Sequence, residues 1–259
     1  MLVFDLDGTL TPSKATMPEP MAHILSRVLE RYDACVISGG AFHRFEKQLL
    51  PALSAARSAE LQRLHLMPTC GTQRYEYDAS AGQWRCVSIE QLSPEEKAEI
   101  TTVLQAAIHH FGYDAELAYG PLVEDRDSQI TYSALGQDIA DVLGEEGLRR
   151  KAEWDPDDLK KRQLQTYLEP RLPNHEVRIA SPTSLDVTRP GMDKAYGVRK
   201  LMELLQLQLQ DVLFFGDRLQ PGGNDYPVKA MGVDAIAVTS WEETAAALQR
   251  ILETTDDKE

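Results

Sequence analysis

Short apolar runs alternate with amphipathic stretches at both ends of the chain. The apolar runs have the length of buried strands, and in the stretches between them apolar residues recur every three or four positions, as on one face of a helix. Strands that alternate with helices are typical of a parallel, doubly wound α/β sheet. Strands are expected at 2–5, 34–37, 212–215 and 235–238, and helices near 18–32, 41–50, 54–64 and 240–253.

The middle of the chain groups its strands and helices instead of alternating them. A hairpin is predicted from the runs 74–77 and 84–87, which flank a Gly-containing turn. This grouping favours an α+β domain over residues 84–188, inserted into a doubly wound core made of 1–83 and 189–259. Within the insert, helices are expected from a capping box at 93–96 to about 110 and from 155 to about 168, and strands near 121–125, 129–133, 175–179 and 184–188.

Composition and charge narrow the class of protein. The net charge of −14 and the pI of about 4.9 disfavour nucleic acid and anionic membranes as partners, because both bind basic patches. Three cysteines without paired spacing are typical of a reducing compartment. Since no apolar run approaches the roughly 20 residues that span a bilayer, and the chain opens on a strand rather than on a signal peptide, we expect a cytoplasmic protein.

Two carboxylates follow the first apolar run, in the sequence Val3-Phe4-Asp5-Leu6-Asp7-Gly8-Thr9. Open α/β sheets bind their ligands at the carboxyl ends of the strands, where Asp5 is expected to lie. A carboxylate there can attack phosphorus and form an aspartyl phosphate. A second carboxylate two residues on, Asp7, can protonate the leaving oxygen and then activate the acceptor. The alternative interpretation is a solvated turn that closes the strand.

A second acidic strand end occurs near the C-terminus, where the run 212–215 leads into Gly216-Asp217 and then Gly-Gly-Asn-Asp at 222–225. Mg²⁺ prefers hard oxygen ligands, and Asp5, Asp217 and the backbone carbonyl of Asp7 would suit it. Asp225 is expected to be a further ligand or to accept a hydrogen bond beside the metal. The alternative interpretation is a glycine-rich turn before a helix.

Two further segments can contact a phosphate. The strand 34–37 ends at Ser38, and a hydroxyl followed by the amides of Gly39 and Gly40 can cradle phosphate oxygens. Lys194 begins the helix after the insert and can neutralise charge on the transferred phosphoryl group and on Asp5. Each is equally consistent with an ordinary turn or a solvated helix residue when taken alone.

Together these segments resemble the four motifs of the haloacid-dehalogenase-like (HAD) phosphotransferases, subfamily IIB. The resemblance implies a catalytic nucleophile at Asp5, a general acid/base at Asp7, and Mg²⁺ as cofactor. Asp-Gly-Thr-Leu-Thr-Pro, Gly-Met-Asp-Lys and Gly-Asp-x-x-x-Pro-Gly-Gly-Asn-Asp further resemble the branch of eukaryotic-type phosphomannomutases and sugar-phosphate phosphatases. That branch carries an α+β cap between its second and third motifs, which is where the insert lies here.

The same resemblance implies how the cap would hold a substrate. Arg126, within Glu124-Asp125-Arg126-Asp127, matches the segment whose arginine grips the distal phosphate of the mutase substrate, and Ser184 and Asp186 match a pair that holds sugar hydroxyls. Asn224 is expected to contact the substrate from the core. A further cap arginine of the mutases has no clear counterpart, because Gln137 follows Ser133-Ala134-Leu135-Gly136. Arg149 and Arg150 are the candidate replacements.

We therefore expect a Mg²⁺-dependent phosphatase that hydrolyses a small sugar phosphate through an aspartyl phosphate. The alternative is a phosphomannomutase or related hexose-phosphate mutase, in which a sugar hydroxyl replaces water as the acceptor. A non-catalytic sugar-phosphate-binding module is a third interpretation, although it would need neither a nucleophile nor an acid. The expected partner is a small phosphorylated sugar, and the resemblance also implies a homodimer formed through the cap.

Overall fold

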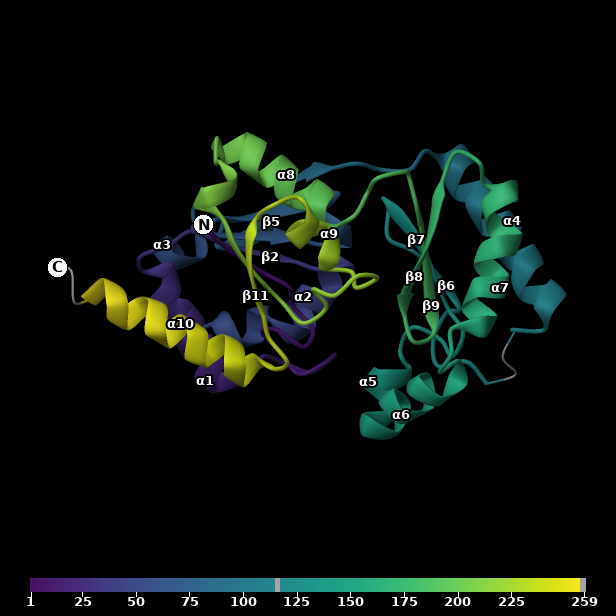
Figure 1. Ribbon diagram of the computed structural model, residues 1–259, viewed down its shortest axis with the longest axis horizontal. Coiled ribbons are helices and arrows are strands. Elements are labelled where there is room, and N and C mark those ends of the chain that lie inside the picture. Colours follow the sequence, from purple (N-terminus) through teal and green to yellow (C-terminus); the bar gives the residue numbers. More distant parts are fainter. Residues whose placement is uncertain (115–116, 257–259) are drawn as a thin grey trace. The chain divides into compact units, whose positions relative to one another are not determined.

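The computed structural model describes residues 1–114 and 117–256 (Figure 1). The chain divides into two compact units: the first joins Met1–Ile89 to Met192–Glu259, and the second is Glu90–Gly191. The second unit is thus an insertion, and each unit has its own sheet.

The first unit is built on a seven-stranded sheet with the order β11-β10-β1-β2-β3-β4-β5. The strands from β11 to β3 are parallel, whereas β4 and β5 form an antiparallel hairpin at one edge. Parallel strands that are buried on both faces have continuous apolar sequences, and most of these strands were predicted from such runs. The strands are β1 (Leu2–Phe4), β2 (Ala34–Ile37), β3 (Leu64–Met67), β4 (Gln73–Asp78), β5 (Gln83–Ile89), β10 (Leu213–Gly216) and β11 (Asp234–Ala237).

Helices cover both faces of this sheet (Figure 1). Successive strand residues point to opposite faces, so Phe4 packs in a core with α1 (Glu19–Leu29) and α10 (Trp241–Asp256), while Val3 packs against α8 (Lys194–Leu205) and α9 (Tyr226–Ala230). The doubly wound α/β fold expected from the sequence is confirmed. The remaining helices of this unit are α2 (Phe42–Gln48), α3 (Ser58–Leu61) and the 3₁₀ turns at Leu50–Leu53, Thr69–Gly71 and Leu209–Asp211.

The second unit contains a four-stranded antiparallel sheet with the order β6-β7-β9-β8. Two helices, α4 (Pro94–Phe111) and α7 (Leu159–Leu168), bury one face of this sheet with apolar residues such as Leu104 and Tyr132. The opposite face carries polar side chains, among them Thr131 and Asp186. The other elements are β6 (Val123–Asp125), β7 (Gln129–Ser133), β8 (Glu176–Ser181), β9 (Ser184–Thr188), α5 (Ile139–Leu143), α6 (Glu145–Trp154) and a 3₁₀ turn at Glu169–Arg171.

Several expectations from the sequence are corrected. The helix expected near 54–64 is the single turn α3, and β3 follows it as a strand that the sequence did not reveal. The insert expected over 84–188 would begin inside β5, but β5 pairs with β4 in the large sheet and therefore belongs to the first unit. The helices α5 and α6 were not expected, and the helix expected from 155 begins at Leu159.

Candidate active site

Two acidic strand ends meet at one edge of the large sheet. Strands β1 and β10 are parallel neighbours with Phe4 opposite Phe215, and the backbone N–H of Asp5 donates to the Phe215 carbonyl at 2.9 Å. Asp5 follows β1 and Asp217 follows β10, so both lie at the carboxyl edge where open α/β sheets bind ligands. This juxtaposition was expected from the sequence.

Asp225 completes a cluster of three carboxylates with Asp5 and Asp217. One oxygen from each lies within 4.8 Å of the others. Asp5 and Asp225 are buried, and Asp217 is half-buried. Three hard oxygen donors at this spacing fit a divalent cation such as Mg²⁺.

Lys194 joins two members of this cluster. It is the first residue of α8, which Asp193 caps by accepting the Tyr196 N–H at 2.9 Å. Its Nζ donates to Oδ1 of Asp5 and, at 2.6 Å, to Oδ1 of Asp225, and its side chain is fully buried. The N-cap of α8 and the two ion pairs fix the Lys194 ammonium group beside Asp5.

The electrostatics of the cluster follow from burial and from the crowding of like charges. Burial raises the pKa of Asp5 to about 8; the Lys194 ammonium opposes this shift and Asp225 adds to it. Burial and Asp225 likewise raise the pKa of Asp217. Burial alone would lower the pKa of Lys194, but the two carboxylates outweigh it and the net shift is upward. Three carboxylates thus share one ammonium, and a bound cation would relieve the crowding that raises the pKa values of Asp5 and Asp217.

Two glycines make room for these carboxylates. A Cβ on Gly8, whose φ is +80°, would lie 2.6 Å from Oδ2 of Asp217. A Cβ on Gly216 would lie 2.5 Å from Oδ2 of Asp225. Both contacts are closer than real Cβ atoms allow, so the absence of a side chain lets the carboxylates approach the backbone.

Asp7 lies outside the three-carboxylate cluster. Its Oδ1 accepts the Gln48 Nε2–H at 3.1 Å and the backbone N–H of Lys14. The side chain of Gln48, at the end of α2, was not anticipated as part of the site. Metal binding through the backbone carbonyl of Asp7 stays a prediction.

Ser38 lies at the end of β2, the neighbour of β1 on its other side. It is buried, its Oγ accepts the Gly40 N–H at 3.1 Å, and its backbone carbonyl accepts the Cys70 N–H at 2.9 Å. The turn that contains Gly39 is therefore held at the same edge of the sheet as Asp5. Asn224, by contrast, is exposed in the loop before α9.

The expected substrate residues of the second unit lie on the polar face of its sheet. Arg126 donates to Oε2 of Glu124 at 2.6 Å and to Oε1 of Gln137 at 3.3 Å. The Thr131 hydroxyl donates to Oδ1 of Asp186 at 2.8 Å, and burial raises the pKa of Asp186 although Arg126 opposes the shift. Ser184, also on β9, accepts a hydrogen bond from the Ser181 hydroxyl at 2.9 Å.

Arg149 and Arg150 are placed differently. Both are exposed on α6, where Arg149 pairs with Glu146 and Glu153, and Arg150 pairs with Glu146. Their charges are therefore matched along their own helix.

Comparison with known proteins agrees with this geometry. A family model described as haloacid dehalogenase-like hydrolase matches residues 129–228. Phosphomannomutase from Galdieria sulphuraria is 24% identical over 258 residues (97% of this chain, 94% of the relative), and that from Drosophila melanogaster is 25% identical over 256 residues (97% and 93%). A haloacid dehalogenase-like hydrolase from Bacteroides thetaiotaomicron has the same fold (TM-score 0.63, 18% identity, 96% of this chain and 98% of that one). The chain is thus similar to the haloacid dehalogenase-like hydrolases, by the family model over residues 129–228 and by its fold over nearly its whole length.

The similarity to the phosphomannomutases extends over nearly the whole chain. The fold is also shared with the inosine monophosphate nucleotidase of Plasmodium falciparum (TM-score 0.68, 17% identity, 97% of this chain and 68% of that one). These similarities support a phosphoryl-transfer enzyme.

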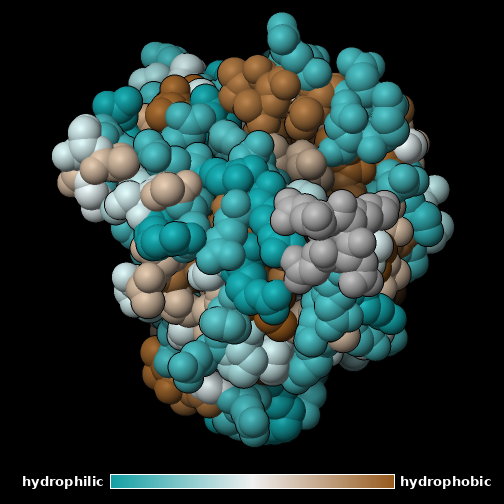
Figure 2. Space-filling view, turned by 90° about the vertical axis from the view of Figure 1, so that its left-hand side faces the viewer, coloured by the Kyte–Doolittle hydropathy of each residue, from teal (hydrophilic) through white to brown (hydrophobic). Residues whose placement is uncertain are grey.

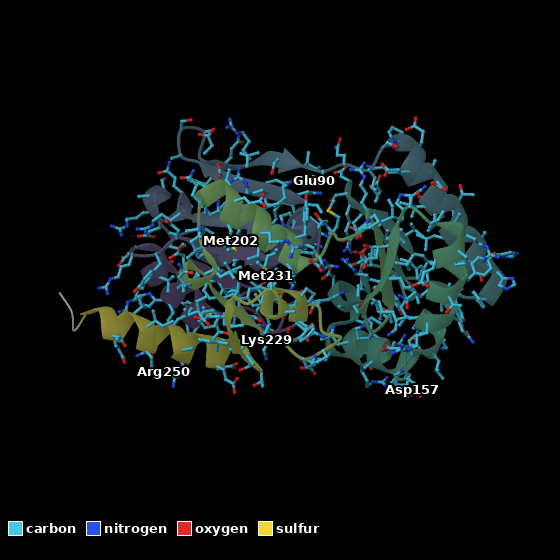
Figure 3. All side chains as sticks on the ribbon, turned by 45° about the horizontal axis from the view of Figure 1, so that its top comes forward. Glu90, Asp157, Met202, Lys229, Met231 and Arg250 are labelled. Atoms are coloured by element: carbon cyan, nitrogen blue, oxygen red, sulfur yellow. The ribbon has the colours of Figure 1, made fainter. Side chains whose placement is uncertain are left out.

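A groove elsewhere on the first unit is separate from the acidic cluster. It has a volume of about 510 Å³ and lies at the end of α8 remote from Lys194, with Met202 and Met231 among its lining residues (Figure 3).

Hydrophilic residues cover much of the face in Figure 2, with hydrophobic residues gathered in patches. No helix in the described part of the chain combines the length and apolar character needed to cross a membrane.

Proposed function

We propose that this protein is a Mg²⁺-dependent phosphatase that hydrolyses a sugar phosphate through an aspartyl phosphate on Asp5. The observation that carries the proposal is the buried cluster in which Lys194 bridges Asp5 and Asp225, with Asp217 beside them, at adjoining strand ends. A module that only binds its ligand, our third interpretation, needs no nucleophile held beside a cation in this way.

The metal would be held by the carboxylates of Asp5, Asp217 and Asp225. When bound there, Mg²⁺ supplies positive charge that stabilises the oxygens of the phosphoryl group. Lys194 adds a second positive charge at the same place.

The chain's own residues would then perform two half-reactions. An oxygen of Asp5 forms a bond to phosphorus while the bond from phosphorus to the sugar oxygen breaks, and Asp7 gives that oxygen its proton. In the second half-reaction Asp7 takes a proton from water, the water oxygen bonds to phosphorus, and the bond to Asp5 breaks. The products are the free sugar and inorganic phosphate.

The charges of the second unit favour water over a free hydroxyl of a phosphorylated sugar as the acceptor. A mutase must grip a bisphosphorylated intermediate at both ends, and bidentate arginines are the usual grip on phosphate. Here Arg126 is paired with Glu124, and both Arg149 and Arg150 pair with carboxylates of α6. An arginine already matched by a carboxylate attracts an additional phosphate less strongly.

A phosphomannomutase remains the second candidate, because the curated relatives that match nearly the whole chain carry that name. Phosphorus NMR of the protein with Mg²⁺ and mannose 1-phosphate, with and without a hexose 1,6-bisphosphate, separates the two. We expect inorganic phosphate to accumulate in both samples. Conversion to the 6-phosphate that depends on the bisphosphate would instead establish a mutase.

The nucleophile is tested by Asp5→Asn, which preserves the shape of the side chain and removes its nucleophilic oxygen. We expect turnover of the phosphatase substrate to fall by roughly three orders of magnitude or more, as for other essential catalytic residues. Circular dichroism and thermal unfolding should show that the fold persists. Undiminished turnover by this variant would contradict the mechanism.

A further inference from the structure

Two donors hold the carboxylate of Asp7 by the same oxygen. The side-chain amide of Gln48 donates to Oδ1 at 3.1 Å, and the backbone N–H of Lys14 donates to the same Oδ1. Among the described residues, these two hydrogen bonds to the carboxylate both end on Oδ1. The arrangement fixes the rotation of the carboxylate and directs Oδ2 away from these donors.

Gln48 is itself held firmly. The residue is 2% exposed, and its backbone carbonyl accepts the Met17 N–H at 2.7 Å. One residue at the end of α2 therefore anchors both ends of the segment from Asp7 to Met17. A donor with so little freedom can orient the group that it contacts.

Packing alone does not explain why an amide side chain occupies position 48. A carboxylate accepts hydrogen bonds and does not donate them, so the amide must turn its Nε2 toward Asp7. In that orientation its Oε1 is buried and, within the described residues, has no hydrogen-bond partner. A buried unpaired oxygen opposes folding, and a methionine of similar length would fill the space without it.

We propose that Gln48 is a positioning residue for Asp7, and that it presents Oδ2 of Asp7 as the oxygen that transfers the proton. Oδ2 gives its proton to the leaving oxygen as the bond from that oxygen to phosphorus breaks. The same Oδ2 then takes a proton from the water that attacks the aspartyl phosphate. This inference rests on the proposed phosphatase function.

Two substrates of similar shape test the role of Gln48. The nitrophenolate of 4-nitrophenyl phosphate departs without protonation, whereas the alkoxide of benzyl phosphate needs a proton from the general acid. The value of kcat/KM reports formation of the aspartyl phosphate, and the ratio of the two values does not depend on how much of a sample is folded.

For Gln48→Met we expect kcat/KM on benzyl phosphate to fall about tenfold, part of the roughly 10²–10⁴-fold that general acid–base catalysis supplies. The value for 4-nitrophenyl phosphate should change by less than about twofold, with Tm unchanged or raised. Gln48→Asn keeps an amide that is too short to reach Asp7, and it should show the same selective loss. A residue that only supports the fold would lower both values equally and lower Tm, which would overturn the inference.

Two comparisons complete the test. Gln73→Met removes another buried glutamine of the first unit and should leave the ratio of the two substrates unchanged. Asp7→Asn should show a larger selective loss, and adding Gln48→Met to it should cause no further loss, since both act through one group. If Asp7→Asn lowers kcat/KM equally on both substrates, the proposed function fails. If Asp7→Asn selectively lowers the value for benzyl phosphate but Gln48→Met does not, only the inference about Gln48 fails.

Discussion

At the scale of single residues, the site depends on a position where a side chain must be absent. Gly8→Ala would place a methyl group 2.6 Å from Oδ2 of Asp217 and displace that carboxylate from the cluster. We expect Mg²⁺ affinity, measured by isothermal titration calorimetry, to fall about 10–100-fold, as when a metal ligand loses its support. The left-handed backbone at Gly8 adds a loss of about 1–2 kcal/mol in the free energy of unfolding.

A second glycine separates these two effects. Gly82 has a φ of +65° in the turn between β4 and β5, but among the described residues a Cβ there would meet only the Tyr77 hydroxyl, at 4.0 Å. Gly82→Ala should therefore show a similar loss of stability with unchanged Mg²⁺ affinity. Equal metal affinities in the two variants would contradict the role of Gly8.

Residues at strand ends were the part of the site that the sequence could place. Asp5 and Asp217 follow apolar runs, and parallel neighbouring strands bring their ends together. Gln48 could not be found in this way, because its contact with Asp7 depends on how α2 is rotated against a distant loop. The pairing of Arg126 with Glu124 is a local contact, because Arg126 directly follows β6 and lies two residues after Glu124.

At the scale of elements, the start of α4 makes a prediction about pH. Ser93 and Glu96 form a capping box, and Arg189 binds Glu96 through two hydrogen bonds. The hydrogen bonds from Arg189 and from the Ser93 N–H lower the pKa of Glu96 to about 2 from 4.5. Because the folded pKa is the lower one, the stabilising effect is complete above pH 4.5 and is lost as the pH falls toward 2.

We therefore expect Glu96→Gln to lower the free energy of unfolding by about 1 kcal/mol or less at pH 7, since solvent screens this partly exposed pair. The difference from the wild type, measured by urea unfolding, should shrink between pH 4.5 and pH 3. Glu95→Gln changes an exposed residue in the same turn and should show little effect at either pH. A difference that grows on acidification would contradict the assignment.

Elements were predictable where length and capping signals agreed. The helix α4 was expected because Ser93 and Glu96 mark its start, and the structure contains both of the expected capping bonds. Strand β3 was missed because its four residues, Leu64–Met67, closely follow a helical turn. They show no alternation of apolar and polar residues that would distinguish a strand from a continuation of the helix. Its pairing with β2, which is a long-range contact, determines its structure.

At the scale of the whole molecule, the insertion leaves two separate hydrophobic cores. The first unit buries Leu25 against its large sheet, and the second buries Leu104 among α4, α7 and its small sheet. The change from alternating to grouped elements predicted this insertion from the sequence. Its start was misplaced because β4 and β5 form an antiparallel hairpin, and neighbouring antiparallel strands are also what was expected inside the insert. Units with their own cores are expected to unfold separately.

Differential scanning calorimetry can test that expectation together with the location of the metal site. Leu25→Ala should lower the transition of the first unit and Leu104→Ala that of the second, each by about 2–5 kcal/mol in the free energy of unfolding. Since all three carboxylates of the cluster belong to the first unit, added Mg²⁺ should raise only the transition that Leu25→Ala lowers. If Mg²⁺ raised the transition sensitive to Leu104→Ala, the metal site would have to be sought in the second unit; if both substitutions lowered one common transition, the two cores would not unfold independently.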